Sequence, residues 1–172
     1  YADLFRHDLP TLDDGRLESI LLGLSREENT PQGFASYLGV VCSERPEIDA
    51  DKTDFDIWAA NVLKAHGKFQ LLCALRNGPF GVSGMNQRIE ALLNKHQLIQ
   101  PTVTWYEGRP VLVTRNDYRL GLMNGDIGIA LSYPVRNKAS GKLEWSIRVA
   151  FPKGDGTAGI HWVLPSRLVS TE

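Results

Sequence analysis

Residues 69–86 read F-Q-L-L-C-A-L-R-N-G-P-F-G-V-S-G-M-N, and this stretch decides how the rest of the chain is interpreted. Phe69 to Leu75 is a short, nearly unbroken apolar run, which is typical of a strand buried on both faces. Asn77-Gly78-Pro79 then ends the run with three residues that favour a turn. From Gly81 onward apolar residues recur every three or four positions, which predicts an amphipathic helix. A buried strand, a glycine turn and a helix form half of a βαβ unit.

The turn after this predicted strand is a candidate ligand site, because open α/β sheets bind ligands at the carboxyl ends of their strands. Arg76 stands at that end, and the backbone N–H groups after Gly78 would open the helix, so a phosphate could be bound there. An ion pair that holds the loop is an equally good interpretation of Arg76. Gly78, Pro79 and Gly81 are predicted to shape the turn, since glycine tolerates positive φ and proline fixes φ.

The chain before this stretch is predicted to be helical. One helix is expected after Asp13-Asp14, a second over the apolar patch 34–41, and a third from Thr53 or Asp54 to His66. Asn29-Thr30-Pro31 is expected to end the first helix. These helices pack a core and carry no chemistry of their own.

Beyond residue 100 the apolar period changes from helical to alternating. The four strand-like runs are 110–114, 126–131, 143–151 and 160–164. Trp145 belongs to the alternating apolar face of the third run and is expected in the core. Asn124-Gly125-Asp126 is predicted to be a hairpin turn of the type that Asn-Gly favours, and the segment 153–156 is a further turn.

The sequence therefore predicts an α/β part followed by a small all-β part. Residues 1–100 are expected to form the helical and α/β unit, and residues 101–172 a small β barrel of SH3-like or OB-like size.

Composition agrees with an ordinary soluble protein, since 42% of the 172 residues are apolar and 23% are charged. No apolar run approaches the ~20 residues of a membrane span, so we expect no membrane contact. The net charge is −1, but residues 101–172 carry nine Lys/Arg against six Asp/Glu, a net +3 that permits contact with nucleic acid. Cys42 and Cys73 are expected to be reduced, buried thiols of a cytoplasmic protein.

Catalytic patterns are missing from the sequence. It contains no G-x-x-x-x-G-K-[ST] loop, no H-E-x-x-H and no C-x-x-C. We therefore predict no catalytic residue, no metal site and no cofactor in this chain.

Two segments resemble a known family. Residues 71–86, L-L-C-A-L-R-N-G-P-F-G-V-S-G-M-N, and residues 105–131, W-Y-E-G-R-P-V-L-V-T-R-N-D-Y-R-L-G-L-M-N-G-D-I-G-I-A-L, resemble the exodeoxyribonuclease V alpha subunit (RecD) family of superfamily 1 DNA helicases. The resemblance resumes at 163–168. It implies an internal fragment, consisting of part of the second RecA-like motor domain followed by an SH3-like barrel, with the P-loop upstream and a T-V-H-K-S-Q-G-like motif downstream.

The resemblance also implies a function for the parent protein. The family uses ATP and Mg²⁺ to move 5′ to 3′ on single-stranded DNA and to unwind duplex ends during double-strand break repair. Its partners are the RecB and RecC subunits of the RecBCD complex. The fragment alone is expected to hydrolyse no ATP. The alternative is a non-enzymatic SH3-like module that docks partner subunits.

Candidate DNA contacts surround the first predicted strand of the barrel. Arg109, Arg115 and Arg119 form a short basic stripe that could follow phosphates. Arg76 is a separate candidate, which would contact the DNA backbone or shape the nucleotide cleft. Trp105 and Tyr106 could stack on unpaired bases. A solvated edge of the barrel is the alternative interpretation of the arginines.

Overall fold

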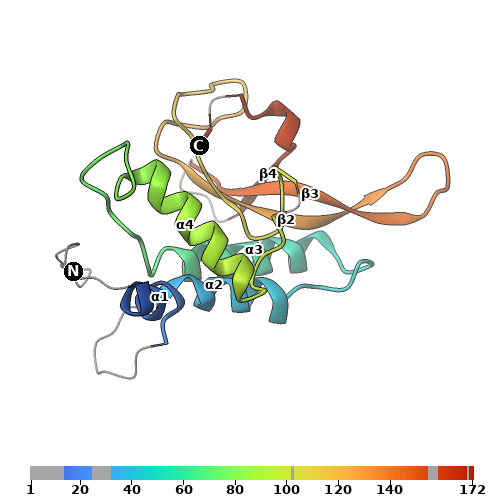
Figure 1. Cartoon of the computed structure of the whole chain (residues 1–172). Coiled ribbons are helices and arrows are strands. Elements are labelled where there is room, and N and C mark those ends of the chain that lie inside the picture. Colours follow the sequence, from blue (N-terminus) through green and yellow to red (C-terminus); the bar gives the residue numbers. More distant parts are fainter. Residues whose placement is uncertain (1–13, 25–31, 102, 155–158, 170) are drawn as a thin grey trace.

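A computed structural model describes residues 14–24, 32–101, 103–154, 159–169 and 171–172 (Figure 1). In these ranges helices come first and strands second. The helices are α1 (Asp14–Leu22), α2 (Gly33–Ser43), α3 (Lys52–His66) and α4 (Val82–Lys95). The strands are β1 (Pro110–Leu112), β2 (Ile127–Arg136), β3 (Leu143–Pro152) and β4 (Ile160–Val163), followed by the short 3₁₀ helix η2 (Pro165–Arg167). The chain is thus mixed α/β.

The predicted helices and the four predicted strands are confirmed to within a few residues, because their apolar periods match the faces that they bury. Helix α3 begins after Asp51, whose backbone is extended, and α4 begins after Gly81. The predicted helix end at Asn29-Thr30-Pro31 lies outside the described residues, as do two positions of the predicted turn 153–156. No helix of the described residues is long and apolar enough to cross a membrane.

The predicted buried strand at Phe69–Leu75 is wrong. The segment is irregular, and only Phe69 is buried, whereas Leu72 keeps 78% of its surface exposed and Leu75 keeps 63%. A strand exists only when a neighbouring strand pairs with its backbone, and the sheet of the described residues contains β1–β4 alone. The prediction of buried thiols is also wrong, since Cys42 is exposed and Cys73 is half-buried.

The sheet is an open antiparallel meander with the order β1-β2-β3-β4. The predicted closed SH3-like barrel is not confirmed, because β1 and β4 are the two edges of this sheet and do not pair with each other. The outer edge of β1 is covered by the last described residues instead. Leu112 and Glu172 exchange two backbone hydrogen bonds of 3.0 Å, and Val113 forms a bridge with Thr171.

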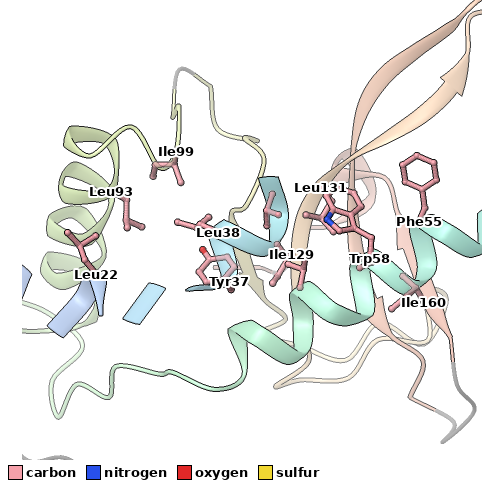
Figure 2. Packing of buried hydrophobic residues seen from close by; sticks show 14 residues of the cluster. Leu22, Tyr37, Leu38, Phe55, Trp58, Leu93, Ile99, Ile129, Leu131 and Ile160 are labelled. Carbon is pink, nitrogen blue, oxygen red and sulfur yellow. The ribbon is translucent and has the colours of Figure 1, made fainter. Parts of the chain in front are cut away.

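One hydrophobic cluster joins the helices to the sheet (Figure 2). Its buried members come from α1–α4 and the segment after α4 (Leu22, Tyr37, Leu38, Val41, Phe55, Trp58, Ala59, Val62, Leu93, Ile99) and from the sheet (Ile129, Leu131, Ala150, Ile160). Two polar contacts also tie the layers together: the Tyr37 hydroxyl donates to the Gly108 carbonyl at 2.9 Å, and Trp162 Nε1 donates to Asp56 Oδ1 at 2.7 Å. The division at residue 100 stays a prediction, but the core extends across it.

A second cluster covers the other face of the sheet. It consists of Val111, Val113, Leu120, Leu122, Ala130, Val149, Phe151 and Val163. Gly128 is required there, because a Cβ atom at this position would lie 2.6 Å from the Phe151 ring. Trp145 does not join this cluster and is 43% exposed, so the prediction of a core residue is wrong. Trp145 lies on the outer half of β3, beyond the part that β4 covers, and its ring instead contacts Phe55 and Arg45.

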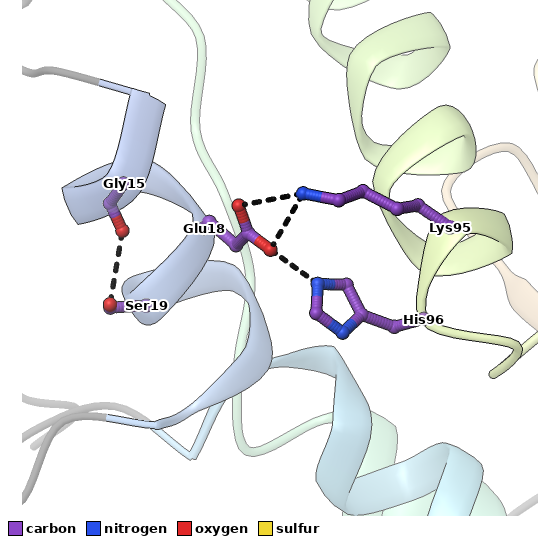
Figure 3. Close-up of polar contacts among 5 residues, drawn as sticks. All are labelled: Gly15, Glu18, Ser19, Lys95 and His96. Atoms are coloured by element: carbon purple, nitrogen blue, oxygen red, sulfur yellow. Dashed lines mark hydrogen bonds and ion pairs between the residues drawn. The ribbon is translucent and has the colours of Figure 1, made fainter.

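A polar contact fastens α1 to the end of α4 (Figure 3). The Glu18 carboxylate accepts from Lys95 Nζ at 3.4 Å and contacts His96 Nε2. The hydrogen bond with His96 is the main cause that holds the pKa of Glu18 below its ordinary value, with the Lys95 ammonium adding to it. This contact connects helices that lie far apart in the sequence.

Candidate nucleic-acid interface

The loop between β1 and β2, the last residue of η2 and described residues after η2 together form an open groove of about 420 Å³. Its lining residues are Val113, Arg115, Asn116, Asp117, Tyr118, Arg119, Leu120, Leu122, Arg167, Leu168, Val169 and Thr171. The two walls meet because the Val113–Thr171 bridge holds the end of the chain against β1. The groove is therefore a product of the tertiary fold.

Hydrogen bonds give the β1–β2 loop a defined shape. Asp117 and Leu122 exchange backbone hydrogen bonds of 2.8 and 3.0 Å. The Asp117 carboxylate also accepts from the backbone N–H groups of Arg119 and Leu120, at 3.0 and 3.2 Å. The loop thus holds its side chains in place before any ligand binds, which lowers the entropic cost of binding.

A turn exists at the predicted Asn124-Gly125-Asp126, but the predicted hairpin type is wrong, because that type needs positive φ at both Asn124 and Gly125 and joins two strands directly, whereas this turn closes the loop 113–126 between β1 and β2. Gly125 has φ +98° while Asn124 has negative φ, and the Asp126 N–H donates to the Met123 carbonyl at 3.0 Å, a pattern typical of a type II turn. Asp126 Oδ2 accepts from the Met123 N–H at 2.8 Å, and Asn116 Oδ1 accepts from the Asn124 N–H at 2.7 Å. The turn therefore shapes the loop that carries the groove.

Cations outnumber anions in the groove. Arg115, Arg119 and Arg167 line it with a single carboxylate, that of Asp117, so the lining carries a net charge of +2. Arg119 Nε lies 3.7 Å from Asp117 Oδ1, and its side chain is 87% exposed. A contact this long and exposed to water leaves the guanidinium able to bind a second anion.

An exposed aromatic ring lies among these cations. Tyr118 keeps 76% of its surface exposed, and its hydroxyl accepts from Asn116 Nδ2 at 3.2 Å. Guanidinium groups around an exposed ring suit a polyanion that also carries flat apolar groups, which describes single-stranded nucleic acid. Among the described residues, no three His, Cys, Asp or Glu side chains gather as metal ligands.

The predicted contacts divide between the groove and other places. Arg115 and Arg119 lie in the groove, and Arg109 does not. The Arg109 guanidinium lies 5.4 Å from the centre of the Trp105 ring and donates to the Thr104 carbonyl. Trp105 itself packs against the second hydrophobic cluster, so its ring is already in contact with protein.

Tyr106 is half-buried against the cluster between helices and sheet. Its hydroxyl donates to Glu90 Oε2 at 3.2 Å, and burial is the main cause that raises the pKa of Tyr106 to about 12, with the Glu90 carboxylate adding to it. The ring and the hydroxyl thus both have protein partners.

The backbone N–H groups on which the predicted phosphate site after Gly78 relied already have partners within the protein. The N–H groups of Gly81, Val82 and Ser83 donate to the carbonyls of Gly78, Leu75 and Arg76 at 3.1, 2.9 and 3.2 Å. The loop folds back over the start of α4 and uses the N–H groups that a phosphate would need.

Steric constraints explain why glycine occupies two positions of this loop. Gly78 has φ +92°, and a Cβ atom on Gly81 would lie 2.4 Å from the Asn77 carbonyl oxygen. Pro79 lies in the exposed part of the same turn. Arg76 is exposed and forms no ion pair with the residues that the structure describes.

Two groove residues were missed from the sequence, Tyr118 and Arg167. Tyr118 lies between Arg115 and Arg119, so its position could have suggested a role. Arg167 is 48 positions after Arg119, and only the fold brings the two together.

The fold and the groove define a mixed α/β chain with an open, basic surface that carries an exposed aromatic ring. No family model matches the sequence. The sequence is similar to curated proteins named RecBCD enzyme subunit RecD. The subunit from Mycobacterium tuberculosis is 46% identical over 80 residues, which covers 44% of this chain and 14% of the relative.

Two further relatives extend the comparison. The RecD subunit of Mycolicibacterium smegmatis is 45% identical over 65 residues, covering 38% of this chain and 12% of the relative. The RecD subunit of Buchnera aphidicola subsp. Schizaphis graminum is 28% identical over 130 residues, which covers 62% of this chain and 22% of the relative. The resemblance to RecD subunits is thus confirmed over partial stretches, and this chain matches 12 to 22% of the length of these relatives.

Proposed function

We propose that this chain is an internal part of a RecD-type DNA helicase subunit. Its parent would use ATP and Mg²⁺ to translocate 5′ to 3′ on single-stranded DNA and to unwind duplex ends in a cytoplasmic RecBCD complex with RecB and RecC. Residues 1–100 would belong to the second RecA-like motor domain and residues 101–172 to an inserted SH3-like subdomain. The similarity to RecD subunits, 46% identity over 80 residues, carries this proposal.

The chain contributes a DNA contact and no catalytic group to this function. Arg115, Arg119 and Arg167 hold three positive charges along the groove, and Tyr118 offers a ring for an unpaired base. Three phosphate contacts would give only a modest affinity for the strand, which suits a motor that must release the strand in every cycle. The sequence has no P-loop lysine, so this chain alone would hydrolyse no ATP.

The test is a titration of a labelled single-stranded oligonucleotide at several salt concentrations. On single strands each phosphate contact contributes about −0.7 to the slope of log affinity against log salt. The double variant Arg115→Ala, Arg119→Ala should therefore lose about 1.4 from that slope. Lys64→Ala, Lys68→Ala is the matched control, because these exposed lysines lie at and after the end of α3 and not in the groove.

The subunit-docking module is the second candidate. It is favoured by exposed apolar side chains within residues 101–172, where Val103, Met123 and Val169 keep 63, 46 and 85% of their surface exposed. If the groove variant binds single strands with the same slope as the control, the groove is a solvated edge and the docking function replaces the DNA contact.

A further inference from the structure

The outer halves of β2 and β3 form a two-stranded arm, residues 133–146, that extends away from the rest of the chain (Figure 1). No third strand pairs with the arm in the part of the chain that the structure describes. β1 pairs only with Ile127–Ile129 of β2, and β4 pairs only with Val149–Pro152 of β3. None of residues 133–146 is buried. At the base of the arm, Tyr133 and Trp145 still contact Phe55 of α3, whereas residues 135–144 belong to none of the hydrophobic clusters of the described residues.

The tip of the arm, residues 137–142, nevertheless has a defined structure. Asn137 organises it: the side-chain Oδ1 accepts from the N–H groups of Ala139 and Ser140 at 2.8 and 3.2 Å, and the backbone N–H donates to the Lys142 carbonyl at 2.8 Å. Gly141 turns the chain with φ +70°, and its carbonyl accepts from Arg136 Nη1 at 2.6 Å. An isolated two-stranded ribbon is marginally stable, so these hydrogen bonds fix a tip that packing does not hold.

The charge of the arm is opposite to that of the remaining chain. Residues 136–144 contain three cations, Arg136, Lys138 and Lys142, against Glu144, a net charge of +2, so the remaining residues carry −3 of the whole-chain charge of −1. Asn137 Nδ2 donates to the Glu144 carboxylate at 2.8 Å. Lys138 and Lys142 are exposed and form no ion pair with the described residues, so both ammonium groups face water.

We propose that this arm is a second nucleic-acid contact, separate from the groove, and that it binds the phosphate backbone of duplex DNA. The inference rests on the proposed DNA-handling function but uses other residues. The tip carries no aromatic side chain, and the two aromatic rings at the base of the arm, Tyr133 and Trp145, already contact Phe55, so the tip offers nothing on which an unpaired base could stack. It also carries no large apolar side chain that could anchor a protein interface, where lysine is depleted.

Duplex DNA fits the remaining features of the arm. Lysine and arginine are the usual partners of phosphate oxygens, and a two-stranded ribbon is narrow enough to lie against or within the major groove. Two lysines on a fixed tip would contact the backbone without reading its sequence. The single strand would be held by the groove and the duplex by the arm.

The test measures affinity for a short duplex and for one of its single strands at several salt concentrations. It uses the whole 172-residue chain, the arm variant Lys138→Ala, Lys142→Ala, the groove variant Arg115→Ala, Arg119→Ala and the control Lys64→Ala, Lys68→Ala. Two lost phosphate contacts should reduce the magnitude of the duplex slope by about 1.8 in the arm variant. Its single-strand slope should equal that of the control. The groove variant should show a smaller single-strand slope and a duplex slope equal to that of the control.

The outcomes separate this inference from the proposed function. A duplex slope in the arm variant equal to that of the control overturns the arm contact, leaves the groove contact standing and points to an acidic protein partner for the arm. An equal loss on single strand and duplex also overturns it, because the arm would then not distinguish the two forms. If the unsubstituted chain binds neither DNA, both proposals fail. Circular dichroism checks that each variant is folded.

Discussion

Replacing Leu131 by alanine tests whether the helices and the sheet share one core. Leu131 lies on β2, is 0% exposed and belongs to the cluster that joins α1–α4 to the sheet (Figure 2). Truncating a fully buried leucine costs about 2–5 kcal/mol, since the transfer free energy is lost and a cavity remains. For a chain of this length each kcal/mol lowers the melting temperature by roughly 2–4 °C. A central cost of about 3 kcal/mol therefore predicts a decrease of about 6–12 °C.

The assay follows two signals during thermal unfolding. Far-ultraviolet circular dichroism reports mainly on the helices. Tryptophan emission combines Trp58 and Trp162, in the layer between helices and sheet, with Trp105 at the second cluster and the exposed Trp145. Both transitions should move down together in Leu131→Ala. The control Val169→Ala removes methyl groups from a side chain that is 85% exposed, and it should change stability by no more than about 0.5 kcal/mol.

One result would refute the shared core. If the helical signal of Leu131→Ala melts at the unsubstituted temperature while the tryptophan signal melts lower, the two parts unfold independently. The division at residue 100 would then describe two cooperative units.

Three further predictions concern local features of the fold. Gly81→Ala should destabilise by at least about 1 kcal/mol because the new Cβ would meet a backbone carbonyl at 2.4 Å, whereas Gly39→Ala, in an open helical position, should stabilise by roughly 0.5–1 kcal/mol; denaturant midpoints compare them. Glu18→Gln should be less stable than the unsubstituted chain at neutral pH. Because the folded pKa of Glu18 lies below its ordinary 4.5, that difference should persist above pH 4.5 and vanish as the pH falls through the folded value; a difference independent of pH would contradict this. A thiol reagent should label the exposed Cys42 in the native state and the half-buried Cys73 more slowly. If Cys73 is labelled only after unfolding, its side chain is fully buried and the expected partial exposure is wrong.

Local sequence patterns determined most of the secondary structure. Helices α2 and α3 follow from apolar residues at helical spacing, and the strands from alternation bounded by turn residues. The turn at Asn124-Gly125 follows from the positive φ that glycine tolerates at Gly125. Each of these features depends on residues that are neighbours along the chain, so the sequence alone is enough to predict it.

The tertiary structure decided what the apolar runs and the arginines do. The run Phe69–Leu75 has the composition of a buried strand, yet a strand also needs a partner backbone, which the described residues do not provide. Trp145 has the alternation of a core residue but lies where only two strands remain. Arg115 and Arg119 meet Arg167 because Val113 pairs with Thr171, a contact between residues 58 positions apart that no local pattern contains.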